Sequence, residues 1–142
     1  MENTDLFNSI SSRARALGQN LLAEHYVRAK RMLTIYRTEM SKVFDDVDAL
    51  ITPATPVIAP KLGAVNVTTE GLIEPAGNAI MRFTNFFNMT GNPAITVPSG
   101  LHSTGLPMGV QLISKQFGES KLLRLAAIMD ANPDFNVPAA SI

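Results

Sequence analysis

Residues 83–100, FTNFFNMTGNPAITVPSG, combine the end of a helix, a sharp change of direction and the start of a strand. Gly91 permits the left-handed backbone conformation that ends many helices, and Pro93 prevents the helix from continuing. The run over residues 94–97 is apolar and β-branched, as strands prefer. The stretch therefore predicts a helix over residues 76–90 that is followed directly by a strand.

The sequence after this stretch predicts a second strand and a second helix. Residues 108–113 form an apolar run in which Gly109 indicates a close approach of another segment and Gln111 requires a hydrogen-bond partner if it is buried. A turn at residues 116–118 leads to a helix over residues 119–129, whose buried side is expected to consist of Leu122, Leu123, Ala126 and Met129. Strands that alternate with helices favour an α/β layer structure.

The sequence before it predicts a long amphipathic helix from about Leu22 to Val47. Apolar residues recur there every three or four positions, which favours a helix packed on a core, with a coiled coil as the alternative. This apolar stripe consists of Leu22, Tyr26, Ala29, Leu33, Tyr36, Met40, Val43 and Val47. We expect a single partial domain over residues 1–142. Its residues 1–19 are expected to form a loosely packed tail or short helix, which Ser9, Ser11 or Ser12 caps and which ends near Gly18.

Two shorter features connect this helix to the central stretch. Residues 48–53, DALITP, form a short apolar run that is stopped by proline, which is typical of a buried strand. Residues 61–75 contain two glycines and pairs of Val and Thr, so a loop with a short hairpin is expected there.

The composition excludes several classes of function. The chain of 142 residues carries twelve basic and twelve acidic side chains, so it offers no charge pattern for nucleic acid or an anionic membrane. No apolar run approaches the roughly 18 residues of a membrane span, and the polar start is unlike a signal peptide. Without cysteine there is no disulfide, thiolate metal site or Cys nucleophile, and a cytoplasmic location is the default expectation.

The residues that usually carry hydrolytic or metal chemistry form no pattern in this chain. His25 and His102 have no companion at metal-ligand spacing, and both are interpreted as surface residues. Neither a Gly-x-Ser-x-Gly elbow nor a Ser-x-x-Lys motif occurs. We therefore predict no metal, no cofactor and no catalytic residue within the chain itself.

Two segments nevertheless resemble the C-terminal region of the amidase signature family. The first is residues 83–100, with its Thr, its Asn four positions later, Gly91, a Pro-Ala pair and a strand that ends Val-Pro-x-Gly. The second is residues 105–113, GLPMGVQLI, and the order of both matches the family. The resemblance implies an α/β fold that is a fragment of the amidase signature fold, a mixed sheet flanked by helices with the long amphipathic helix before it.

The resemblance also implies a mechanism that this chain does not complete. Amidase signature enzymes use a Ser–cis-Ser–Lys triad, in which one Ser attacks the amide carbonyl and Lys is the ultimate base. In the family, the Lys and both Ser lie in the N-terminal half, and the two Ser belong to a glycine- and serine-rich segment. Nothing in this chain corresponds to that segment. Ser9, Ser11 and Ser12 lack the glycines and are better interpreted as helix caps.

Three positions bear on the substrate of such an enzyme. Met81 stands where the glutaminase chains of tRNA-dependent amidotransferases carry an Asp, so the chain is more similar to general amidases. Thr84 and Phe87 lie one turn apart on the expected helix, and the resemblance implies that such positions line the acyl cavity. The alternative is that Phe83, Phe86 and Phe87 are core residues.

Two functions therefore stay open. In the first, the chain is the inactive C-terminal part of an amide hydrolase, with a small-molecule amide as the substrate of the intact enzyme and a separate N-terminal half as its partner. In the second, it is a free-standing, non-catalytic binding module on the same scaffold. In both, strands cut from a larger sheet would expose edges and apolar faces, so self-association is expected.

Overall fold

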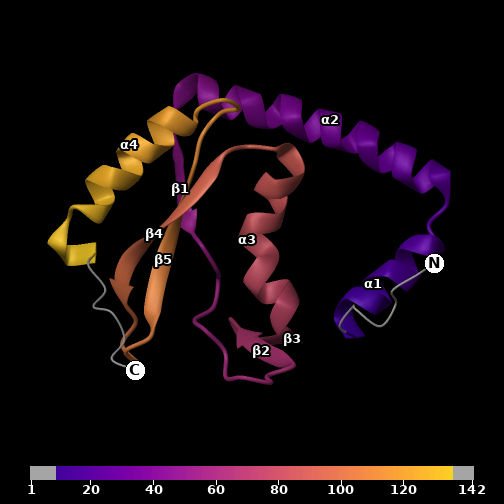
Figure 1. Cartoon of the computed structure of the whole chain (residues 1–142), viewed down its shortest axis with the longest axis horizontal. Coiled ribbons are helices and arrows are strands. Elements are labelled where there is room, and N and C mark those ends of the chain that lie inside the picture. The colour runs from indigo at the N-terminus through magenta and orange to yellow at the C-terminus, as the bar shows by residue number, and fades with distance from the viewer. Residues whose placement is uncertain (1–8, 136–142) are drawn as a thin grey trace. The chain divides into compact units, whose positions relative to one another are not determined.

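A computed structural model describes residues 9–135 of the chain (Figure 1). The chain divides into two compact units, Met1–Tyr36 and Arg37–Ile142. Among residues 9–135, none of the helices combines the length and the hydropathy that a membrane span requires.

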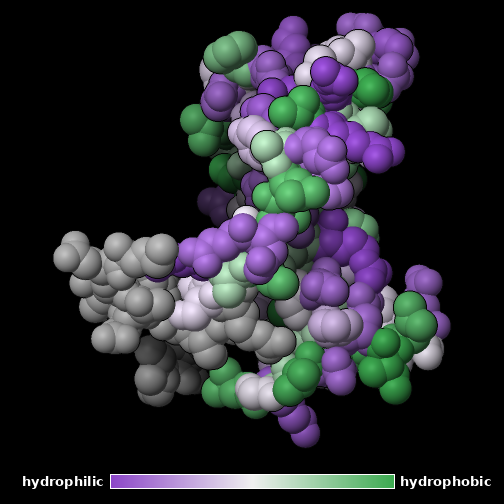
Figure 2. Space-filling model, turned by 90° about the vertical axis from the view of Figure 1, so that its right-hand side faces the viewer, coloured by the Kyte–Doolittle hydropathy of each residue, from purple (hydrophilic) through white to green (hydrophobic). Residues whose placement is uncertain are grey.

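The first unit contains helix α1, Ser9–Gln19, and the first half of helix α2, Ala23–Asp46. The bounds of both helices agree with the sequence prediction, although Ser11 and Ser12 lie inside α1 and therefore do not cap it. The expected burial of the apolar stripe on α2 is wrong for most of its members. Leu22 and Tyr26 are 59% and 66% exposed, and Met40 is the one buried stripe residue. The periodicity of apolar residues defines the helix, whereas burial also requires a second layer, which the described residues supply only near Met40. Figure 2 accordingly shows hydrophobic side chains standing at the surface among hydrophilic ones.

The second unit is built on a three-stranded antiparallel sheet (Figure 1). Its order is β1, Leu50–Pro53, then β5, Pro107–Ile113, then β4, Ala94–Leu101. In β5, Leu112 pairs with Ile51 of β1 and with Ile95 of β4. Strand β4 is longer than the predicted residues 94–97, because pairing resumes beyond an irregularity between Pro98 and Leu101.

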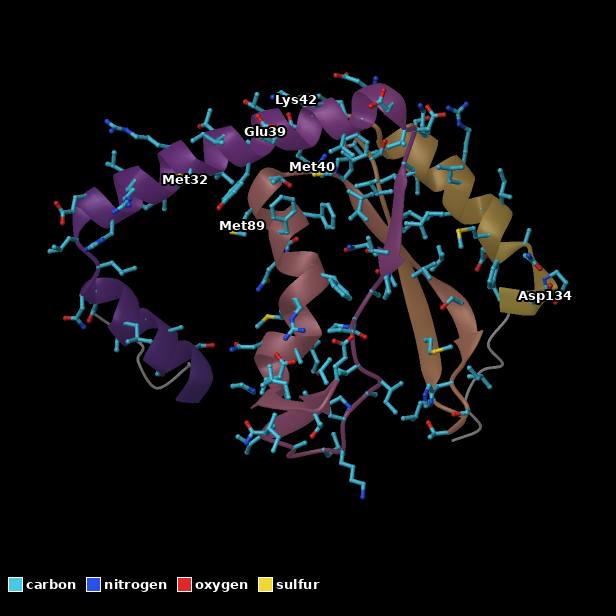
Figure 3. The ribbon with its side chains drawn as sticks, turned by 180° about the vertical axis from the view of Figure 1, so that it is seen from behind. Met32, Glu39, Met40, Lys42, Met89 and Asp134 are labelled. Atoms are coloured by element: carbon cyan, nitrogen blue, oxygen red, sulfur yellow. The ribbon has the colours of Figure 1, made fainter. Side chains whose placement is uncertain are left out.

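Helices cover both faces of this sheet. Leu112 packs with Val97 and with Leu122 and Ala126 of helix α4, Glu119–Asp130. Its neighbour Ile113 points to the opposite face, since side chains alternate along a strand. There Ile113 packs with Met40 of α2, and with Phe87 of helix α3, Ala76–Thr90. Figure 3 shows Met40 on the side of α2 that faces the sheet.

One expected core residue of α4 is exposed. Leu122 and Ala126 are buried and Met129 is half-buried, as predicted, but Leu123 is 61% exposed. Consecutive helical residues are rotated by about 100° around the axis, so Leu123 leaves the buried face that Leu122 occupies. A 3₁₀ turn, η2, follows α4 at Pro133–Phe135 and packs near β4.

The hairpin expected between residues 61 and 75 is present. Strand β2, Asn66–Thr69, pairs antiparallel with β3, Leu72–Pro75. The two residues between them, Glu70 and Gly71, both have positive φ angles, 51° and 82°, as a type I′ turn requires. The hairpin leads directly into α3, and the amide of Ala76 donates a hydrogen bond to the carbonyl of Val65.

Candidate functional site

The turn between α3 and β4 joins the two segments that carry the sequence motif. Gly91 ends α3 in the left-handed conformation, with φ 78° and ψ 23°, and its amide donates to the carbonyl of Phe87 at 2.9 Å. The side-chain amide of Asn92 donates to the carbonyl of Ser114 at 2.8 Å, and the amide of Ser114 donates to the carbonyl of Pro93. The motif residues therefore connect the end of α3 to the end of β5.

Gly109 and Gln111 of β5 have the packing roles that their residue types suggest. A Cβ atom on Gly109 would lie 3.0 Å from Cγ2 of Thr96, so the close approach expected from the sequence is confirmed. Gln111 is buried, and its Nε2 donates to Oγ1 of Thr52 at 3.4 Å and to the carbonyl of Phe83 at 3.5 Å. Gly109 thus allows β5 and β4 to approach closely, and Gln111 joins β5 to β1 and to α3.

The two expected substrate residues lie in different surroundings on α3. Phe87 is buried among Met40 and Ile113, and its ring meets that of Phe86 edge-on, with centroids 5.5 Å apart. Thr84 is half-buried, and its hydroxyl donates to the carbonyl of Met81 at 3.3 Å. Their role toward a substrate stays a prediction, since the packing of Phe87 also fits a core residue.

A groove of about 970 Å³ lies elsewhere on the second unit, and neither Thr84 nor Phe87 lines it. One wall is the loop that follows β1, with Pro56, Val57 and Ile58. Another wall is the β2–β3 hairpin, and the middle of α3 adds Arg82 and Phe83. The end of β4, the loop after it and the start of β5 complete the lining. Their residues are Ser99, His102, Pro107, Met108, Gly109 and Val110.

The polar residues of this groove were not identified from the sequence. Glu74 of β3 forms an ion pair with Arg82 of α3, and the carboxylate side chain is only 11% exposed while the guanidinium side chain is 45% exposed. The second carboxylate oxygen of Glu74 and the hydroxyl of Thr69 are buried, and no donor in residues 9–135 reaches them. Eight positions separate Glu74 from Arg82, across a strand end and a helix start, so no local pattern links them.

Three further polar side chains have partners within the chain. His102, expected at the surface, is half-buried, and its Nδ1 lies 2.9 Å from the hydroxyl of Thr104. The hydroxyls of Ser41 and Ser114 donate to backbone carbonyls. Within the described residues, no three or more His, Asp and Glu side chains gather where they could hold a metal ion.

Comparison with known proteins places these features in a family. The family model described as Amidase matches residues 2–123. The A subunit of the glutamyl-tRNA(Gln) amidotransferase of Myxococcus xanthus is 36% identical over 121 residues, which is 84% of this chain and 24% of that protein. The corresponding protein of Salinibacter ruber is 40% identical over 118 residues, which is 81% of this chain and 22% of that protein. The chain thus spans about a quarter of the length of these relatives.

Solved structures agree with this match. A protein from a vestigial complex, described as revealing the evolutionary origins of an s-triazine catabolic enzyme, superposes with a TM-score of 0.86 at 29% identity. That superposition covers 94% of this chain and 29% of the other. A crystal structure described as an amidase superposes with a TM-score of 0.85 at 28% identity, over 92% of this chain and 30% of the other.

Proposed function

The chain belongs to the amidase signature family, and we propose from this membership that it forms the C-terminal part of an amide-bond hydrolase. The observation that carries the proposal is the joined motif. The turn at Gly91 and the bonds of Asn92 and Ser114 tie α3, β4 and β5 into one unit, and this unit superposes on solved amidases. Because the chain spans about a quarter of its relatives, the activity belongs to a larger assembly.

In this proposal the catalytic residues come from outside the chain. The family's Ser–cis-Ser–Lys triad needs a serine whose hydroxyl can lose its proton to a neighbouring group. Ser41 and Ser114 instead donate to carbonyl oxygens, which cannot act as bases. Since nothing in the chain corresponds to the family's glycine- and serine-rich segment or to its Lys, we propose that the chain on its own does not hydrolyse amides and that a separate N-terminal amidase part supplies the nucleophile.

The proposed contribution of this chain is a scaffold and one side of a substrate site. Thr84 and Phe87 are the residues that we propose to approach the acyl group, since they lie one turn apart on α3. Phe87 would then have two roles, because its ring also fills the core beside Ile113. An aromatic side chain at that position would favour small or flat acyl groups over long chains.

The substrate class that we propose is a general small-molecule amide. It is supported by Met81, an exposed, uncharged side chain at the position where the glutaminase chains of amidotransferases carry an Asp. The second candidate is glutamine hydrolysis within a tRNA-dependent amidotransferase. It is favoured by the curated relatives, which are described as the A subunits of such enzymes.

The test is ammonia release from simple amides and from glutamine. The chain is assayed alone and after co-expression with the portion of the Myxococcus xanthus relative that it does not match. We expect no release by the chain alone and release by the mixture. Any turnover by the chain alone above background would contradict the proposal, and the combined variant Ser9→Ala, Ser11→Ala and Ser12→Ala would show whether one of these serines is the nucleophile. Preferred hydrolysis of glutamine by the mixture would favour the second candidate.

A further inference from the structure

The β2–β3 hairpin has few elements to hold it. Its two strands form a separate two-stranded sheet, and α3 is the regular element on which both strands pack. A lone hairpin is marginally stable in water and depends on the element beneath it. The position of this wall of the groove is therefore determined by its contacts with α3.

Those contacts come from one face of the hairpin. Val67 pairs with Glu74 and Thr69 with Leu72, so all four side chains lie on the same face. On this face Val67, Thr69 and Glu74 are half-buried and Leu72, next to the turn, is exposed, whereas Thr68 and Ile73 on the other face are both exposed. Glu74 is the member of this face that forms an ion pair with α3, through Arg82.

The same face of the hairpin also contains two buried acceptors that destabilise the closed position. One carboxylate oxygen of Glu74 and the hydroxyl of Thr69 are removed from solvent without a donor from the described residues. A buried acceptor that is left unsatisfied loses its hydrogen bonds to water and gains none in return. Opening the hairpin would return both acceptors to water, and the ion pair with Arg82 opposes that opening.

We propose that the β2–β3 hairpin is a movable wall of the groove, and that the Glu74–Arg82 pair is the latch that holds it against α3. Glu74 and Arg82 are positioning residues, because they determine where the hairpin lies against α3. Regions with few buried contacts open at lower free energy than the core. Opening widens the groove on the side lined by Thr69, Glu70 and Leu72. The proposal does not depend on the proposed function, since its test requires no catalysis.

The test is amide hydrogen exchange on the whole chain, comparing residues 66–75 with residues 107–113 of β5. In Glu74→Gln and Arg82→Met we expect the hairpin amides to exchange at least about tenfold faster while β5 is unchanged. Arg82→Lys should stay near the original rate, because the contact joins one nitrogen to one oxygen. Thr69→Val should slow hairpin exchange, because it removes an unsatisfied hydroxyl at nearly constant shape.

The exposed pair Glu39–Lys42 supplies the matched control, and Glu39→Gln should leave both regions unchanged. Unchanged hairpin exchange in Glu74→Gln and Arg82→Met would overturn the proposal. So would an equal rise in β5, since the pair would then stabilise the whole unit rather than the hairpin. If Glu74→Gln and Arg82→Met do not fold, Thr69→Val tests the proposal instead. Slower hairpin exchange in that variant supports it, and faster hairpin exchange contradicts it.

Discussion

The Nε atom of Arg37 donates a hydrogen bond to the carbonyl oxygen of Thr90 at 3.0 Å, across 53 positions of sequence. The last carbonyls of a helix have no partner within the helix, so α3 depends on such donors. The side-chain amide of Gln116 reaches the same oxygen at 3.2 Å. Three segments thus meet at the end of α3, next to the turn that carries the family motif.

We expect Arg37→Met to lower the free energy of unfolding by about 1–2 kcal/mol, because a charged donor to a half-buried carbonyl is lost. Arg28→Met, on the exposed part of the same helix, is the control and should change it by less than about 0.5 kcal/mol. Urea unfolding monitored by circular dichroism measures both. Equal effects of the two variants would show that the bond to Thr90 contributes nothing.

Replacement of Gly109 tests the tight contact in the sheet. We expect Gly109→Ala to cost about 1–3 kcal/mol, because its Cβ would meet Cγ2 of Thr96 at 3.0 Å. Thr96→Ser removes that methyl group, so the cost should shrink in the double variant. Gly77→Ala, which meets nothing within 4 Å in α3, is the control and should be neutral or stabilising. An unchanged cost in the double variant would mean that the strain lies elsewhere.

Substitution of Phe87 distinguishes a role in the core from a role in binding the substrate. On the chain alone, Phe87→Ala should lower stability by about 3–5 kcal/mol, because it leaves a cavity beside Ile113. Phe117→Ala, at a side chain that is 93% exposed, is the control and should have little effect. In the hydrolytic assembly proposed above, a selective rise of kcat/KM for bulky amides would support the substrate role. A uniform loss for all amides would leave Phe87 as a core residue only.

The ion pair between Asp48 and Lys121 predicts a pH dependence. The hydrogen bond and the charge of Lys121 lower the pKa of Asp48 below its ordinary value of 3.8. A carboxylate whose pKa falls on folding stabilises above its ordinary pKa, and that contribution disappears as pH drops through the folded value. The melting temperature of Lys121→Met should therefore be lower than that of the original chain at pH 7. The two melting temperatures should converge as the pH falls below 3.8. If the melting temperatures still differ in acid, the effect of Lys121 comes from packing of its aliphatic stem and not from the ion pair.

Exposed apolar side chains predict self-association of the isolated chain. Ile51 on the edge strand β1 is 64% exposed, and Leu72 and Ile73 of the hairpin are 66% and 71% exposed. Such surfaces and unpaired edges favour association. Light scattering should show a mass that rises with concentration, and Ile51→Lys should reduce it. A monomer at high concentration that binds no hydrophobic dye would contradict this expectation.

Short-range chemistry was sufficient to predict the local elements and the family. Gly91 and Pro93 limit the backbone to a few conformations, so the end of α3 and the start of β4 follow from residues within a short window. The same local chemistry predicted α4 and the hairpin. The order of the motif residues along the chain was likewise enough to indicate the amidase signature family.

Which residues meet across the fold could not be predicted in this way. The periodic stripe of α2 predicted burial, yet Tyr26 is exposed and Met40 is buried, because burial depends on which layer lies opposite. The groove and its Glu74–Arg82 pair likewise join a strand to a helix, and Arg37 reaches Thr90 from another helix. Backbone preference acts over a few neighbouring residues, whereas contacts between distant segments are selected by the packing of the whole unit.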